Sequence, residues 1–149
     1  MTVPHVPILS PELLPISLGT PLDGRSKTVV SDLINPYGFV VFRGYGVSSD
    51  QEFHDFIECF GLPNFTYAES FSNAVRRNRT PHVFTANEAP PEIEIFLHHE
   101  MAQTLVFPGQ LFFFCEQAPT QGGATPIGRS DLALVALEKS RPDFVAKLK

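Results

Sequence analysis

A run of alternating apolar residues in the second half of the chain predicts a β-strand from about Ile93 to Ala102. Because side chains on a strand alternate between its two faces, His98 and Glu100 are expected to point the same way. His99, between them, is expected on the opposite face. A fold that contains this strand therefore carries an imidazole and a carboxylate side by side on a rigid piece of backbone.

An imidazole and a carboxylate in this arrangement are two of the three ligands of a 2-His-1-carboxylate site for non-haem iron(II). A single His-x-Glu step also occurs often by chance, and the alternative interpretation is a polar patch on a half-exposed strand. Phe96 and Ala102 share the face of His98 and Glu100, so the polar pair is expected in a partly apolar pocket. A cation between them would remove the cost of burying them. The third ligand has to come from elsewhere.

Other catalytic sites are excluded by residue spacing. A zinc site of the HExxH type needs a second histidine one helical turn after the first, but position 103 is Gln. The chain has no GxSxG motif, and nothing pairs Cys115 with a base. Cys59 and Cys115 lie far apart and belong to no CxxC pair, which excludes a zinc ribbon or a thioredoxin-like motif.

Composition indicates one globular domain, because the 149 residues are 43% hydrophobic and 18% charged. The net charge of −5 argues against a nucleic-acid or anionic-membrane partner, and the basic cluster Arg76-Arg77-Asn78-Arg79 is interpreted as a solvated loop. There is no apolar run of membrane-spanning length and no signal peptide pattern. We therefore expect a cytoplasmic protein in which both cysteines are reduced.

The other segments predict a mixed α+β chain. Residues 1–24 are proline-rich and are interpreted as an extended N-terminal arm, and residues 25–149 as a single domain. Ser49 and Glu52 form a capping box for one of the helices, and Gly61 closes it. Residues 62–81 are expected to form a loop. Helices are predicted at 25–35, 50–60, 131–139 and from 142 to the end, the third capped by Ser130, and further short strands at 38–44, 82–86 and 111–115, the last buried on both faces.

Several motifs occur in a specific order along the chain. They are His98-His99-Glu100-Met101-Ala102-Gln103, Leu111-Phe-Phe-Phe-Cys115-Glu116 and Gly122-Gly-Ala-Thr-Pro126, with Pro108 and Pro119 between them and Gly38-Phe-Val-Val-Phe-Arg-Gly44, Phe60-Gly61 and Val83-Phe-Thr-Ala-Asn87 upstream. This order resembles the taurine dioxygenase-like (TauD/TfdA) family, and most closely its clavaminate-synthase-like branch. The resemblance covers roughly residues 25–149.

The resemblance implies a double-stranded β-helix (jelly-roll), present here in part, with the N-terminal helices packed against it. It also implies an Fe(II)/2-oxoglutarate-dependent dioxygenase that oxidises a small-molecule substrate with O2. By this resemblance His98 and Glu100 would be the first two iron ligands. Thr125 would contact the carboxylate of 2-oxoglutarate, although the Gly122-Gly123 step alone predicts only a tight turn.

Two parts of the family pattern are missing. The family has a second iron-binding histidine and an arginine for 2-oxoglutarate far downstream, whereas no histidine follows His99 here. Arg129 and Arg141 flank a predicted helix and do not match that arginine. His5, His54 and His82 do not match a ligand position either. We therefore expect an N-terminal portion of an oxygenase, weakly active or inactive as written.

An alternative function follows from the incomplete fold. A jelly roll needs about eight strands, and the sequence predicts fewer. Sheet edges would therefore stay open and prone to association. The segment Phe112–Phe114 is the expected exposed surface. The alternative is therefore a non-catalytic remnant that acts as an interaction or dimerisation module.

Overall fold

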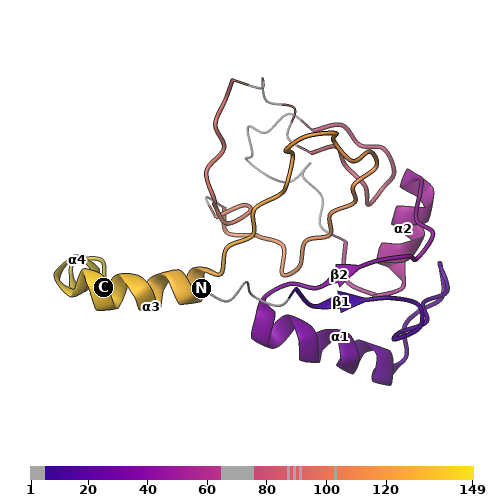
Figure 1. The fold of residues 1–149 in the computed structure, drawn as a ribbon, viewed down its shortest axis with the longest axis horizontal. Coiled ribbons are helices and arrows are strands. Elements are labelled where there is room, and N and C mark those ends of the chain that lie inside the picture. Colours follow the sequence, from indigo (N-terminus) through magenta and orange to yellow (C-terminus); the bar gives the residue numbers. More distant parts are fainter. Residues whose placement is uncertain (1–5, 65–75, 87, 89, 91, 103) are drawn as a thin grey trace. The chain divides into compact units, whose positions relative to one another are not determined.

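The computed structural model describes residues 6–64, 76–86, 88, 90, 92–102 and 104–149. The element order is β1 (Ile8–Leu9), α1 (Gly24–Tyr37), β2 (Val41–Phe42), α2 (Asp50–Glu58), α3 (Ser130–Ser140) and α4 (Pro142–Ala146) (Figure 1). The chain divides into two compact units. Unit 1 comprises residues 1–94 and 98–118, and unit 2 comprises residues 95–97 and 119–149. None of the described helices is long and apolar enough to cross a membrane.

Helix α1 is held by a cap at each end. The Asp23 carboxylate accepts a hydrogen bond from the Ser26 amide at 2.7 Å, and Gly38 donates its amide to the Ile34 carbonyl at 2.6 Å. The prediction that the helix stops before Pro36 is wrong, since Pro36 lies inside it. Gly38 adopts φ 80°, a left-handed conformation that suits glycine, and this cap sets the actual end.

Helix α2 begins as the sequence predicts. The Ser49 hydroxyl accepts the Glu52 amide at 3.2 Å, and the Glu52 carboxylate in return accepts from the amide and hydroxyl of Ser48 at 2.9 and 2.7 Å. These hydrogen bonds, the Ser48 hydroxyl first, hold the pKa of Glu52 below its usual value. The prediction that Gly61 closes the helix is wrong, since α2 ends at Glu58 with Cys59 as its C-terminal cap, and Gly61, at φ 62°, lies beyond that cap.

The core of unit 1 lies between α1, α2 and the N-terminal residues. The Phe42 ring meets the rings of Tyr45, Phe56 and Phe60 edge-on, with centroids 5.7, 5.2 and 5.8 Å apart. The buried residues of this cluster are Leu9, Leu14, Leu22, Val30, Phe56, Cys59 and Phe60. Three of them belong to the segment that the sequence predicts as an extended arm, so that segment is an integral part of the core.

The sheet is smaller than expected. β1 and β2 are parallel, with Ile8 opposite Val41 and Leu9 opposite Phe42, and they run side by side in Figure 1. The strands predicted at 93–102 and 111–115 are absent from the described residues, and 82–86 contributes a single antiparallel bridge, Asn78 to Phe84. A strand needs a neighbour for its backbone groups, and neither 93–102 nor 111–115 pairs with another strand among the described residues. Helix and sheet are mixed, as expected, and a partial jelly roll stays a prediction.

The segment 111–115 lies with one face on the core and the other exposed. The Phe112 ring packs on Phe60 at 5.0 Å and the Phe114 ring on Phe53 at 5.2 Å between centroids, whereas the Phe113 side chain is 73% exposed. The prediction of burial on both faces is therefore wrong. The expected exposure of Phe112–Phe114 holds fully only for Phe113, because alternate side chains of an extended segment face opposite ways.

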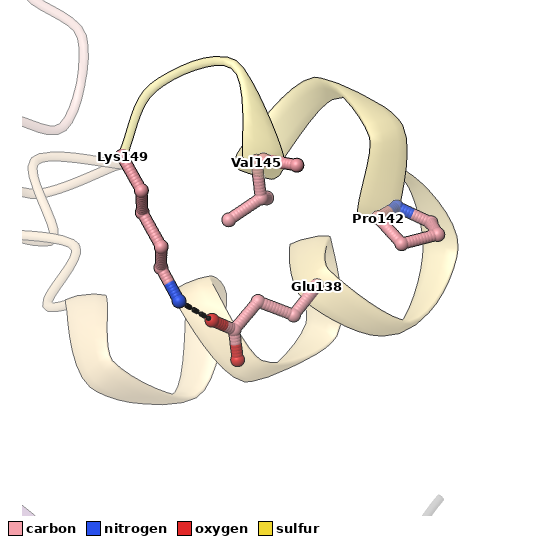
Figure 2. A pocket seen from close by; sticks show the side chains of 5 residues that line it. Glu138, Pro142, Val145 and Lys149 are labelled. Atoms are coloured by element: carbon pink, nitrogen blue, oxygen red, sulfur yellow. Dashed lines mark hydrogen bonds and ion pairs between the residues drawn. The ribbon is translucent and has the colours of Figure 1, made fainter.

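Unit 2 contains α3 and α4. Ser130 is the first residue of α3 and not its cap, because Arg129 precedes it without a side-chain capping bond. Pro142 opens α4 as predicted, but that helix ends at Ala146. No residue of α3 is buried. A pocket of about 270 Å³ next to these helices is lined by Glu138, Pro142, Val145, Ala146 and Lys149. Lys149 and Glu138, which form an ion pair at 2.9 Å, contribute to this lining (Figure 2).

Candidate metal centre

The His98–Glu100 step lies in an irregular segment that ends in a turn, and not in the predicted strand. Met101 is 3% exposed and adopts φ 61°, a left-handed conformation that is uncommon for a residue with a side chain. The amide of Ala102 bonds to the His99 carbonyl at 3.3 Å, which closes the turn. Burial of the Met101 side chain thus anchors a backbone reversal directly after Glu100.

The turn still brings the two predicted ligands close together. His98 Nε2 lies 3.8 Å from Glu100 Oε2. The Glu100 side chain is 16% exposed and that of His98 is 58% exposed. Imidazole nitrogen and carboxylate oxygen bind a metal at about 2.1 Å, so two such atoms at a right angle around it are about 3 Å apart. A small approach of the two side chains would therefore accommodate an ion, and the pair fits two ligands of an iron(II) site.

A cationic side chain already contacts this carboxylate. Arg76 Nη2 donates to Glu100 Oε1 at 3.0 Å, and both side chains are largely buried, with 18% and 16% of their surface exposed. Arg76 thus binds one oxygen of Glu100, while the other oxygen lies towards His98. The interpretation of residues 76–79 as a solvated loop is wrong at this position. No sequence pattern relates Arg76 to Glu100, so sequence reasoning missed this contact.

The neighbouring arginines form ion pairs as well. Arg77 pairs with Glu88 at 3.1 Å, and Arg79 contacts Asp50 at 2.6 Å and Glu116 at 3.0 Å. The contacts of Arg79 connect the loop with the start of α2 and with the end of the segment 111–115. All three arginines of residues 76–79 therefore form ion pairs with acidic side chains.

His99 and Thr125 are the other residues that the motifs single out. The side chain of His99 is exposed. Thr125 is exposed and belongs to unit 2, whereas His98 and Glu100 belong to unit 1. No group of three or more His, Cys, Asp or Glu side chains that could hold a metal occurs within the described residues.

Two further histidines form a pair that no spacing in the sequence indicates. The rings of His54 and His82 are 4.7 Å apart between centroids, and His82 Nδ1 lies 2.8 Å from Glu58 Oε1. His54 is half-buried on α2. His5 lies outside the described residues, as does the segment 65–75 of the predicted loop.

The hydrogen bonds of Thr80 decide what His54 can do. The Thr80 hydroxyl oxygen accepts the amides of His82 and Val83 at 3.3 and 3.1 Å, which uses both of its lone pairs. Its hydrogen is then left to donate to His54 Nδ1, 3.0 Å away. A neutral His54 consequently carries its own proton on Nε2, and that tautomer does not offer Nε2 to a metal.

Comparisons with known proteins agree with the motifs. The family model for the taurine catabolism dioxygenase TauD, TfdA family matches residues 4–149. A clavaminate synthase-like protein of Arabidopsis thaliana is 39% identical over 135 residues, and the dapdiamide synthesis protein DdaC of Enterobacter agglomerans is 26% identical over 136 residues. Each alignment covers 91% of this chain and 40% of the relative's length. The chain belongs to the taurine catabolism dioxygenase TauD, TfdA family.

Proposed function

We propose that this chain is the N-terminal portion of an Fe(II)/2-oxoglutarate-dependent dioxygenase and that His98 and Glu100 supply two of its iron ligands. The observation that supports the proposal most directly is the 3.8 Å approach of His98 Nε2 to Glu100 Oε2 within a chain of this family. Members of the family generally use Fe(II) and 2-oxoglutarate. The oxidation of a small molecule is the activity proposed for the whole protein, of whose relatives this chain spans 40%.

Each residue has a definite role in this proposal. When bound, Fe(II) and 2-oxoglutarate would supply the chemistry by which O2 oxidises the substrate. His98 would bind the metal through the neutral Nε2 atom, and Glu100 through Oε2. The Thr125 hydroxyl would donate a hydrogen bond to a carboxylate of 2-oxoglutarate. The free thiols of Cys59 and Cys115 fit the reducing conditions of the cytoplasm, where we place the protein.

The same proposal predicts little turnover by the chain alone. No histidine follows His99, and neither Arg129 nor Arg141 matches the arginine that the family uses for 2-oxoglutarate. A site with two protein ligands loses affinity for both the metal and the co-substrate. We therefore expect weak metal binding and little or no succinate formation when the chain is tested without further polypeptide.

The test is a titration of the purified chain with Co(II), an air-stable substitute for iron(II). Calorimetry and visible absorption detect the binding. We expect weak binding that is lost in His98→Ala and in Glu100→Gln. His99→Ala is the matched control, since its side chain is the exposed neighbour of both ligands. Equal binding by all four proteins would place the ion elsewhere and would contradict the proposal. Turnover is tested by loading the chain with Fe(II) and 2-oxoglutarate under anaerobic conditions, adding O2 and measuring the succinate formed.

A second candidate function is an interaction or dimerisation module without catalysis. It is supported by a set of apolar side chains in unit 1 that are at least 47% exposed, namely Ile93, Leu105, Val106, Phe107, Leu111 and Phe113. Size-exclusion chromatography with light scattering, over a range of concentrations, tests it. We expect concentration-dependent association that Phe113→Ser weakens. A chain that stays monomeric at every concentration would exclude this function.

A further inference from the structure

We propose that Arg76 binds Glu100 in place of a metal ion and thereby lowers the affinity of this chain for iron(II). The inference rests on the proposed function, because it concerns the same site. Arg76 Nη2 lies 3.0 Å from Glu100 Oε1, on the carboxylate that would ligate the metal. The contact connects the loop at 76–79 with the turn at 100–102, two segments whose spacing in the sequence gives no reason to pair them.

The charges around the site support competition. Arg76 keeps its charge at any pH at which the chain is folded, because a guanidinium is not deprotonated in proteins. With a neutral His98, the group formed by Arg76, His98 and Glu100 carries no net charge. A divalent cation gains little from a neutral group and is repelled by the guanidinium. The large burial of Arg76 and Glu100 strengthens that repulsion, because water screens it poorly.

The opposite interpretation is that Arg76 assists the metal by orienting Glu100. Hydrogen bonds to a ligating carboxylate do fix its position, and removing such a partner typically costs about 10- to 100-fold in metal affinity. A unit charge within about 4–6 Å of a carboxylate changes the equilibrium constant for its proton binding by about 10- to 1000-fold. The repulsion between a guanidinium and a dication involves twice the product of charges that acts on a proton. The electrostatic effect is therefore the larger, and it has the opposite sign.

The consequence is a folded state that is stable without metal. Glu100 is neutralised by a side chain of the same polypeptide, so its burial does not depend on an ion. Loading the site requires the guanidinium to move away from Glu100 Oε1 or to tolerate the ion beside it. Arg76 is thus a residue that tunes affinity, and it is not itself a ligand.

The experiment compares Co(II) binding by the full chain and three variants in calorimetric titrations. Arg76→Gln removes the charge and keeps a hydrogen-bond donor, whereas Arg76→Lys keeps the charge. Arg77→Gln is the matched control, because Arg77 forms an ion pair with Glu88 in the same loop away from the site. We expect Arg76→Gln to bind Co(II) about tenfold more tightly or better. Arg76→Lys and Arg77→Gln should remain close to the parent chain.

Several outcomes would overturn the inference. Weaker or unchanged binding by Arg76→Gln would make Arg76 a positioning residue, while the proposed function would survive through the loss of binding in Glu100→Gln. Absence of Co(II) binding by Arg76→Gln up to millimolar concentration would also contradict it. If the double variant Arg76→Gln/Glu100→Gln kept the tighter binding, the ion would sit elsewhere and the proposed function itself would fail.

Thermal unfolding supplies a second readout that is independent of binding heats. Without metal, Arg76→Gln should have a lower Tm than the parent chain, because Glu100 is left buried with a charge and without its arginine. Saturating Co(II) should recover that loss in Arg76→Gln and shift the parent chain much less. Circular dichroism establishes that the variant is folded. A Tm that does not respond to Co(II) in Arg76→Gln would count against competition.

Discussion

Two stretches of unit 1 are both rich in apolar residues and differ in what they bury. Residues 6–61 enclose a cluster of seven buried residues. In residues 98–118, apart from position 103, which the structure does not describe, Met101 is the only buried residue. Apolar character is thus sufficient for burial only where another segment supplies a matching surface. The candidate metal centre lies in the second stretch, where the Arg76–Glu100 ion pair and the buried Met101 side chain stabilise the turn.

The backbone partners account for the difference. The amides of Val41 and Arg43 donate to the carbonyls of Pro7 and Leu9 at 2.9 and 2.8 Å, which makes β2 a strand. The segment Leu111–Cys115 is at least as apolar as β2. The rings of Phe112 and Phe114 pack on other rings, but the segment forms no strand. Strand formation therefore depends on a neighbouring chain more than on composition.

The difference in packing between the two stretches is tested most directly by removing one aromatic ring from each. Phe56 is 5% exposed and contacts three other rings, and Phe→Ala changes in a core typically cost about 3–5 kcal/mol. We expect Phe56→Ala to lower the free energy of unfolding by about this amount in urea titrations. Phe113→Ala, at a residue that is 73% exposed, should change it by less than about 0.5 kcal/mol. Similar losses in the two variants would mean that both stretches are equally packed.

A smaller effect sharpens the comparison within the well-packed stretch. Hydrogen bonds from Ser48, and then from Ser49, hold the pKa of Glu52 below its usual value of 4.5. Because the folded-state pKa is the lower one, this contribution to stability is complete above about pH 4.5 and is lost as the pH falls through the folded-state pKa.

Glu52→Gln should therefore lose less stability than the parent chain between pH 5 and about pH 3. Unfolding curves in urea at several pH values measure this difference. Asp32→Asn, at an exposed carboxylate on α1, controls for the general effect of removing a carboxylate. Parallel pH profiles for Glu52→Gln and the parent chain would show that the cap does not contribute.

Local signals predicted two helix starts. The cap at Ser49 and the start of α4 at Pro142 depend on residues within one helical turn, so the sequence contains the whole cause. The error at Pro36 shows the limit of such rules, because the capping geometry of Gly38 carried the helix two residues further. The strand predictions failed more widely, since alternation describes one segment and pairing requires two.

The candidate site divides in the same way. The residues 98–100 and the family to which the chain belongs were readable from the order of the motifs, and the approach of His98 to Glu100 follows from their short separation. The strand that was expected to hold them is replaced by a turn at Met101. Neither the contact of Arg76 with Glu100 nor the pairing of His54 with His82 could be predicted, because their partners are 24 and 28 positions apart and no period connects them.

The sequence by itself determined the chemical groups, the starts of α2 and α4 and the family, because each of these depends on residue identity or on neighbours within a few positions. Only the tertiary structure decided which cation contacts Glu100, which rings pack around Phe42 and which apolar segments remain exposed. Those outcomes depend on long-range packing, in which a segment is ordered by whatever surface the rest of the chain presents to it. Glu100 illustrates both: the sequence makes it a carboxylate beside a histidine, and the fold gives it an arginine.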